Sequence, residues 1–165
     1  IIKKHSDYVS YPIYIDGDKA NEQESLWRKK PSDVDEEAYK NFYQMMTFDF
    51  VPPIETIHFN TDMPVNLRAL MFIPSKRDKG PMSQRKEPGV KLYSNNVLIQ
   101  EYCTDLLPEW LGFIDGVIDS EDLPLNVSRE MVQSNPVLRQ LQKALTNRVF
   151  RDLKNLAEND AEKYQ

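Results

Sequence analysis

The segment formed by residues 123–133 carries the residues best suited to chemistry. Its composition favours a loop that turns into a helix beginning at Arg129, which places Arg129 and Gln133 at i and i+4 on one helical face. An arginine at such a junction, backed by a glutamine one turn later, can present a fixed cation to a phosphate from outside. The competing interpretation is a surface arginine in a salt bridge with an acid such as Glu121 or Asp122.

The other ionisable residues match no familiar metal or nucleotide motif. His5 and His58 lack the HExxH or HxH spacing that brings two imidazoles to one metal ion, so we interpret each as a surface or core histidine. The acidic run at 119–122 lacks the alternating ligands and glycine of a calcium loop and is interpreted as a solvated turn. GxSxG, GxGxxG and GxxxxGK[ST] are all missing, and five glycines leave no phosphate cradle. We expect no metal site, and neither ATP binding nor ATP hydrolysis by this chain alone.

Composition excludes several classes of protein. The chain has 165 residues, 21 Lys plus Arg against 26 Asp plus Glu, and a formal net charge of -5, so it has no overall positive field for a nucleic acid. Cys103 is the only cysteine, which excludes an internal disulfide and a cysteine-rich zinc site and favours a reducing compartment. No apolar run approaches the ~20 residues of a membrane span, so we expect a soluble protein with no membrane contact. The absence of an initiator Met suggests a fragment.

The elements that would position these residues follow from hydrophobic periodicity. We predict strands at residues 11–15, 54–59, 67–73, 90–93, 97–99 and 117–118. We predict helices at residues 1–9 (weak), from 31–33 to 46 with Ser32 or Asp33 as N-cap, at 105–114, and from Asn135 onward. The loops at 16–25 and 74–89 are polar, and the second is long enough to be functional or disordered. Helices and strands alternate until about residue 120, which predicts an α/β class with an α-helical extension.

One family accounts for most of these patterns. The stretch Gly116-Val-Ile-Asp-Ser-Glu-Asp-Leu-Pro-Leu-Asn-Val-Ser-Arg-Glu-Met-Val-Gln133 closely resembles the middle domain of the Hsp90 chaperones. The resemblance extends over residues 1–13, 26–27, 31–33, 68–74, 91–93 and 160–164, and so covers nearly the whole chain. It implies an α/β/α sandwich with a mixed central sheet over residues 1–130, followed at 131–165 by the start of a helical connector.

The resemblance also implies roles for particular residues. Arg129 matches the family's catalytic arginine, which reaches the γ-phosphate of ATP, and Gln133 and Asn126 match positions in the same catalytic loop. Trp27 matches a tryptophan implicated in client contact, and we expect it to be at least partly exposed because the flanking loops offer few covering partners. The alternative for Trp27 is a half-buried core residue.

For partners and cofactors, the resemblance implies a homodimeric ATPase. ATP and Mg would be bound by an N-terminal domain absent from this chain, and dimerisation would use a C-terminal domain, so the isolated fragment is expected to be inactive. The partners would be those two domains, client proteins and co-chaperones. The alternative from another class is a non-catalytic protein-interaction module.

Two departures from the family are visible. Many members carry Arg-x-Pro-Phe-Asp after the Ile-Pro pair, whereas residues 75–88 contain no Phe, and the loop at 16–25 is short. These differences indicate either an altered contact with the N-terminal domain or residues missing near 16–25 and 75–89. The run from Tyr93 to Gln100 is similar to organellar and bacterial members, which leaves the cytoplasm, mitochondrion and plastid open as compartments.

Overall fold

The computed structural model describes Tyr8 and residues 11–20, 25–75, 89–124 and 135–160. The expected helix at 1–9, most of the loop at 74–89 and the predicted catalytic loop therefore lie wholly or largely outside the described residues. The elements, in order, are β1 (Tyr14–Ile15), β2 (Asp18–Lys19), the 3₁₀ turns η1 (Leu26–Arg28) and η2 (Pro31–Asp33), α2 (Glu36–Thr47), β3 (Glu55–Thr61), β4 (Leu67–Ile73), β5 (Val90–Ser94), β6 (Val97–Cys103), η3 (Glu109–Leu111), β7 (Asp115–Asp119) and α4 (Pro136–Asn159).

Five of the strands form one mixed sheet in the order β3-β4-β7-β5-β6. All neighbouring pairs are antiparallel except β5 and β7, which run parallel. The late strand β7 is thereby inserted between two earlier strands, and all five of its residues are buried. The carboxyl end of β7, where the segment toward Arg129 begins, is held from both sides.

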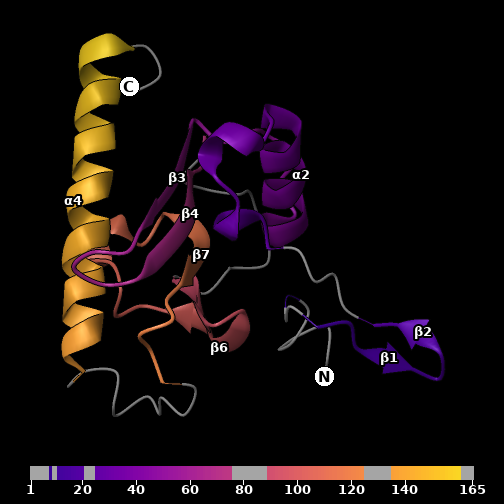
Figure 1. Cartoon of the computed structure of the whole chain (residues 1–165). Coiled ribbons are helices and arrows are strands. Elements are labelled where there is room, and N and C mark those ends of the chain that lie inside the picture. Colours follow the sequence, from indigo (N-terminus) through magenta and orange to yellow (C-terminus); the bar gives the residue numbers. More distant parts are fainter. Residues whose placement is uncertain (1–7, 9–10, 21–24, 76–88, 125–134, 161–165) are drawn as a thin grey trace.

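Strand β4 shows why the sheet must be covered on both faces. Leu67, Ala69, Met71 and Ile73 belong to one hydrophobic cluster, and the intervening Leu70 and Phe72 belong to another. Alternate side chains of a strand point to opposite faces, so a continuous apolar run requires a partner layer on each side. Figure 1 shows these layers, with α2 and α4 on opposite sides of the sheet. The α/β prediction is confirmed.

Helix α2 begins later than the sequence predicted. Pro31, Ser32 and Asp33 form the separate turn η2, so neither Ser32 nor Asp33 is the N-cap. The cap is Asp35, whose Oδ1 accepts a hydrogen bond of 2.7 Å from the Ala38 N–H. The predicted apolar stripe does face the sheet, since Phe42 and Tyr43 are buried in the α2-side cluster.

Helix α4 begins as predicted, with Asn135 as N-cap accepting a hydrogen bond of 2.9 Å from the Val137 N–H, and Pro136 in the first turn. Four of its five buried residues join the cluster on the sheet face opposite α2; they are Leu138, Leu141, Leu145 and Val149. The helix thus supplies the second covering layer. The division of the chain at residue 130 stays a prediction.

Residues 105–114 do not form the predicted helix. Leu106, Leu107, Leu111 and Ile114 are buried as the spacing suggested, but the only helical part is the 3₁₀ turn η3 after Pro108. Trp110, which was expected on the core side, is 54% exposed.

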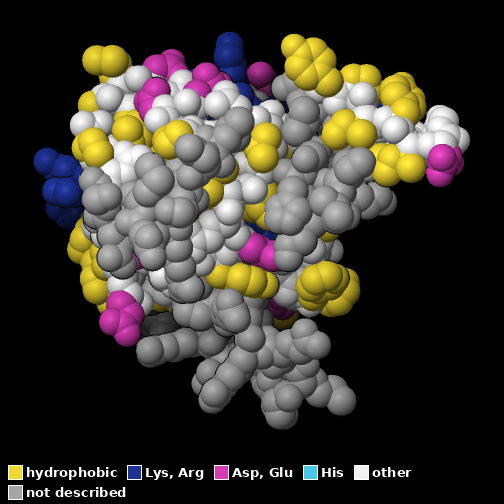
Figure 2. Space-filling view, turned by 90° about the horizontal axis from the view of Figure 1, so that it is seen from below, with side chains coloured by type: hydrophobic (Ala, Val, Ile, Leu, Met, Phe, Trp, Pro, Cys, Tyr) yellow, Lys and Arg dark blue, Asp and Glu magenta, His cyan; other side chains and the backbone are white. Residues whose placement is uncertain are grey.

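The first two strands form a short hairpin that projects from the sandwich (Figure 1). Asp16 and Gly17 both have positive φ, 52° and 92°, at its turn, and this part of the predicted loop is therefore ordered as β-structure. Tyr11, Tyr14 and Ile15 are exposed, and Figure 2 shows hydrophobic side chains along this projection.

Candidate functional site

The predicted catalytic residues Asn126, Arg129 and Gln133 lie outside the described residues. The structure does describe the polypeptide on both sides of them. Residues 119–124, here called the exit segment, lead from the end of β7 toward this loop, and Asn135 begins α4 after it.

A buried carboxylate, that of Asp119, anchors the start of the exit segment. Its side chain is fully buried, and Oδ2 accepts hydrogen bonds from Trp27 Nε1 at 3.1 Å, Arg28 Nε at 2.7 Å and the Asn96 backbone N–H at 3.3 Å. A buried charge requires such partners because it has lost its hydration. The site thereby joins η1, the β5–β6 turn and the end of β7.

Arg28 extends this anchor to a second acid. Its Nη1 donates to Glu121 Oε1 at 2.9 Å, and its side chain is 26% exposed. Burial lowers the pKa of Arg28, but its hydrogen bond to Asp119 and the charges of Asp119 and Glu121 outweigh this and raise that pKa above its ordinary value. The guanidinium is therefore charged at any physiological pH.

The rest of the exit segment is held by side chain to backbone hydrogen bonds. The Ser120 hydroxyl donates to the Asn66 carbonyl, and the Asn66 N–H donates to Asp122 Oδ2 at 2.6 Å. The buried Ser94 hydroxyl donates to the Leu123 carbonyl at 2.6 Å. Side chains from η1 and β5 and the backbone of Asn66 in the β3–β4 loop thus hold the chain where it leaves the sheet.

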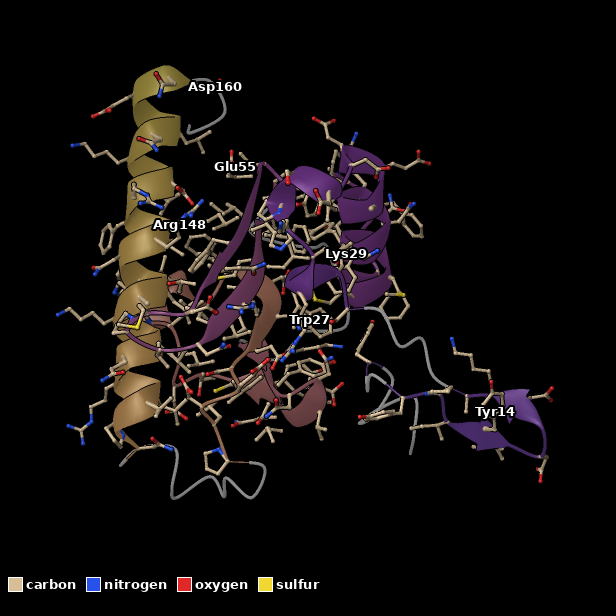
Figure 3. The ribbon with its side chains drawn as sticks, in the orientation of Figure 1. Tyr14, Trp27, Lys29, Glu55, Arg148 and Asp160 are labelled. Atoms are coloured by element: carbon tan, nitrogen blue, oxygen red, sulfur yellow. The ribbon has the colours of Figure 1, made fainter. Side chains whose placement is uncertain are left out.

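The prediction that Trp27 is partly exposed is wrong, because the side chain is 0% exposed. Its ring centroid lies 4.6 Å from that of Tyr8, 4.9 Å from that of Tyr93 and 6.1 Å from that of Phe42. These partners come from distant parts of the sequence, which local composition does not reveal. Figure 3 places Trp27 between the sheet and the α2 side of the molecule. Client contact through Trp27 stays a prediction, and it requires the indole to become accessible.

His58 is a core histidine with a partner for each ring nitrogen. Nε2 lies 3.3 Å from the Trp27 carbonyl oxygen, which can only accept, so Nε2 carries the proton and Nδ1 accepts from the Tyr39 hydroxyl at 2.6 Å. Burial lowers the pKa of His58, although hydrogen bonds with the backbone of Trp27 and Lys29 oppose the shift. The neutral ring links α2, β3 and η1. His5 lies outside the described residues.

The metal and thiol chemistry of the described residues is limited. No group of three or more His, Cys, Asp or Glu side chains among them could hold a metal ion. Cys103 is a free, buried thiol whose pKa is raised to about 11, mainly by burial, which makes it a poor nucleophile at neutral pH. In the part of the chain that the structure describes, no helix is long and apolar enough to cross a membrane.

Sequence reasoning missed an apolar surface groove of about 650 Å³, lined by residues from the β3 and β4 region, from η3 and its flanks, and from the last turns of α4. Exposed aromatic side chains form its rim, and the ring centroids of Trp110 and Phe150 lie 5.1 Å apart. Apart from Lys154 the lining is apolar, which suits a hydrophobic peptide segment and does not suit a triphosphate with its Mg²⁺. Trp110 could be mistaken for core because it follows two buried leucines.

The sandwich and the anchored exit segment define an α/β module, and comparison with known proteins shows its family. The model of the Hsp90 protein family matches residues 15–165. The chaperone protein HtpG of Nitratidesulfovibrio vulgaris is 43% identical over 164 residues, covering 99% of this chain and 26% of that protein. The chain therefore belongs to the Hsp90 family.

Mitochondrial relatives match over the same extent. The TNF receptor-associated protein 1 homolog, mitochondrial, of Dictyostelium discoideum is 40% identical over 164 residues, which is 99% of this chain and 23% of that protein. The heat shock protein 75 kDa, mitochondrial, of Rattus norvegicus is 37% identical over 165 residues, which is 99% of this chain and 23% of that protein. The chain spans about a quarter of the length of these curated relatives.

Proposed function

We propose that this chain is the middle domain of an ATP-dependent Hsp90-type chaperone, which binds client proteins and supplies Arg129 to an ATPase site on the N-terminal domain. The observation that carries the proposal is the anchoring of the exit segment. Hydrogen bonds from the Arg28 and Ser94 side chains and from the Asn66 backbone hold it where it leads into residues 125–134. A loop that presents a cation to another domain needs such a fixed origin.

Arg129 would stabilise the charge that develops on the transferred phosphoryl group, a contribution of ~10³ to 10⁵ in rate in other phosphoryl-transfer enzymes. Gln133, four residues later, and Asn126, three residues before, would position the guanidinium within the same loop. The nucleotide and its Mg²⁺ would be held by the N-terminal domain, and neither cofactor is assigned a site in this chain.

The competing non-catalytic module would use Arg129 only in a salt bridge with Glu121 or Asp122. Both acids already have partners, since Glu121 pairs with Arg28 at 2.9 Å and Asp122 accepts the Asn66 N–H at 2.6 Å. This arrangement favours the catalytic assignment because it reduces the need of either acid for a second cation.

The client-binding part of the proposal is supported by the apolar groove. Its rim residues Trp110 and Phe150 are 54% and 52% exposed, and such a patch offers hydrophobic contact to an apolar segment of a non-native protein. The partners of the full protein would follow the family pattern: a homodimer formed through a C-terminal domain, clients and co-chaperones.

The proposal is tested by supplying the N-terminal domain in trans. This chain should raise the ATP turnover of the separate N-terminal domain when titrated into it, while the chain alone should show no turnover. The Arg129→Ala chain should bind the N-terminal domain comparably but fail to raise turnover. Equal stimulation by both chains would support the non-catalytic module instead.

A further inference from the structure

The contact between Arg28 and two acids of the exit segment has no counterpart among the other described ion pairs. Arg28 bridges the fully buried Asp119 and the half-exposed Glu121, at 2.7 Å and 2.9 Å, from a 3₁₀ turn far away in the sequence. Arg68 and Arg148, by comparison, pair with acids of their own β3–β4 hairpin or their own helix. Arg28 therefore fixes one part of the fold relative to another.

The bridge lies at the point where the chain leaves β7. β7 is paired on both sides up to Asp119, where Arg68 and Tyr93 are its register partners. Beyond that point regular strand pairing stops, and the Glu121 side chain is 45% exposed. A planar guanidinium that donates through two different nitrogens holds its two acceptors in a fixed relative orientation, which a single contact does not.

We propose that Arg28 is a positioning residue for the ATPase reaction: by bridging Asp119 and Glu121 it sets the direction of the exit segment and thereby the position from which Arg129 reaches the phosphate. This inference rests on the proposed function. Arg28 itself touches neither nucleotide nor the reacting atoms. Its effect on rate arises because small displacements of a catalytic group lower the rate strongly.

The chemistry of the bridge predicts a graded series of variants. Arg28→Met keeps most of the side-chain length and removes both contacts. Among the described residues, Asp119 then keeps Trp27 Nε1 and the Asn96 N–H as donors. Arg28→Lys keeps the charge but can reach only one acid at a time. Arg148→Met is the matched control, because Arg148 Nε contacts Asp152 at 2.6 Å with similar exposure but on α4, across the sheet from Trp27 (Figure 3).

The experiment measures ATP turnover and the KM for ATP of the complete protein that contains this chain. Arg28→Met should lower kcat about tenfold with KM changed by less than about twofold, Arg28→Lys should restore part of the loss, and Arg148→Met should match the unmodified protein. A merely structural role would instead lower the amount of folded protein, which active-site titration detects, without changing kcat per folded molecule.

A second measurement on this chain alone does not depend on ATPase chemistry. The backbone N–H groups of Asn66 and Asn96 donate to acids of the exit segment, so their hydrogen exchange reports its order. Arg28→Met should accelerate exchange at both, and Arg148→Met should not. Accelerated exchange with unchanged kcat would overturn the positioning role while leaving the proposed function intact. Unchanged turnover in Arg129→Ala, measured in parallel, would overturn the proposed function itself.

Discussion

Replacement of Trp27 by alanine tests the architecture around the exit segment most severely. The side chain is 0% exposed, contacts the rings of Tyr8 and Tyr93, and donates its indole N–H to the buried Asp119. Truncation of a buried Trp costs ~3–5 kcal/mol through lost transfer energy and the cavity left behind. Loss of a hydrogen bond to a charged acceptor, worth ~1.5–3 kcal/mol, places the expected cost in the upper part of that range.

Urea unfolding followed by circular dichroism measures this cost. With an m-value of ~2 kcal/mol/M, a loss of ~4–5 kcal/mol lowers the unfolding midpoint by about 2–2.5 M. Trp27→Phe should be milder, at ~1.5–3 kcal/mol, because it retains much of the ring and loses the N–H donor. This variant keeps the test usable if the alanine variant does not fold.

The second tryptophan provides the control. Trp110 is 54% exposed at the rim of the apolar groove, so Trp110→Ala should cost ~1 kcal/mol or less in the same experiment. A cost below ~1 kcal/mol for Trp27→Ala would refute the buried placement of Trp27. If that substitution also weakened client binding, the original client-contact prediction would stand.

Two further predictions concern the packing of the sheet and its pH dependence. Gly116→Ala should destabilise the fold by ~1–3 kcal/mol in urea unfolding, because the added Cβ would lie 2.6 Å from the Leu70 carbonyl oxygen and 2.8 Å from Met71 Cα. In the folded protein the pKa of His58 is lowered, so the native ring resists protonation. In the unfolded chain the ring gains a proton below about pH 6.5. The free energy of unfolding should therefore fall as the pH drops below that value. His58→Gln should lose this part of the pH dependence between about pH 7.5 and 5.5, and identical pH profiles for the two proteins would contradict the buried neutral ring.

Elements with a strong periodic pattern could be predicted from the sequence. Strand β4 has the predicted bounds because its nearly continuous apolar run begins and ends with the strand. Helix α4 begins at Asn135-Pro136 as predicted because an N-cap residue and a first-turn proline are local signals. The prediction for residues 105–114 failed because burial of leucines at helical spacing does not require a helix, and only a single 3₁₀ turn forms there.

The anchor of the candidate site could not be predicted in the same way. Arg28 and Asp119 are 91 residues apart, and no local pattern pairs them. The loops predicted on either side of Trp27 suggested few covering partners for it, whereas the fold directs Arg28 toward the acids and the indole into the core. A sequence can indicate that a loop carries a cation without indicating which residues hold the loop in place.

The most direct test of the central claim is ATP turnover by the complete protein carrying Arg129→Ala, measured together with its affinity for nucleotide. If Arg129 acts on the transferred phosphoryl group, turnover should fall by about tenfold or more while nucleotide affinity changes by less than about twofold, because the contact is made mainly in the reacting state. Arg129→Lys should recover only part of the rate, since an ammonium cannot reproduce the planar guanidinium. Unchanged turnover in Arg129→Ala would contradict the account and leave the non-catalytic interaction module in its place.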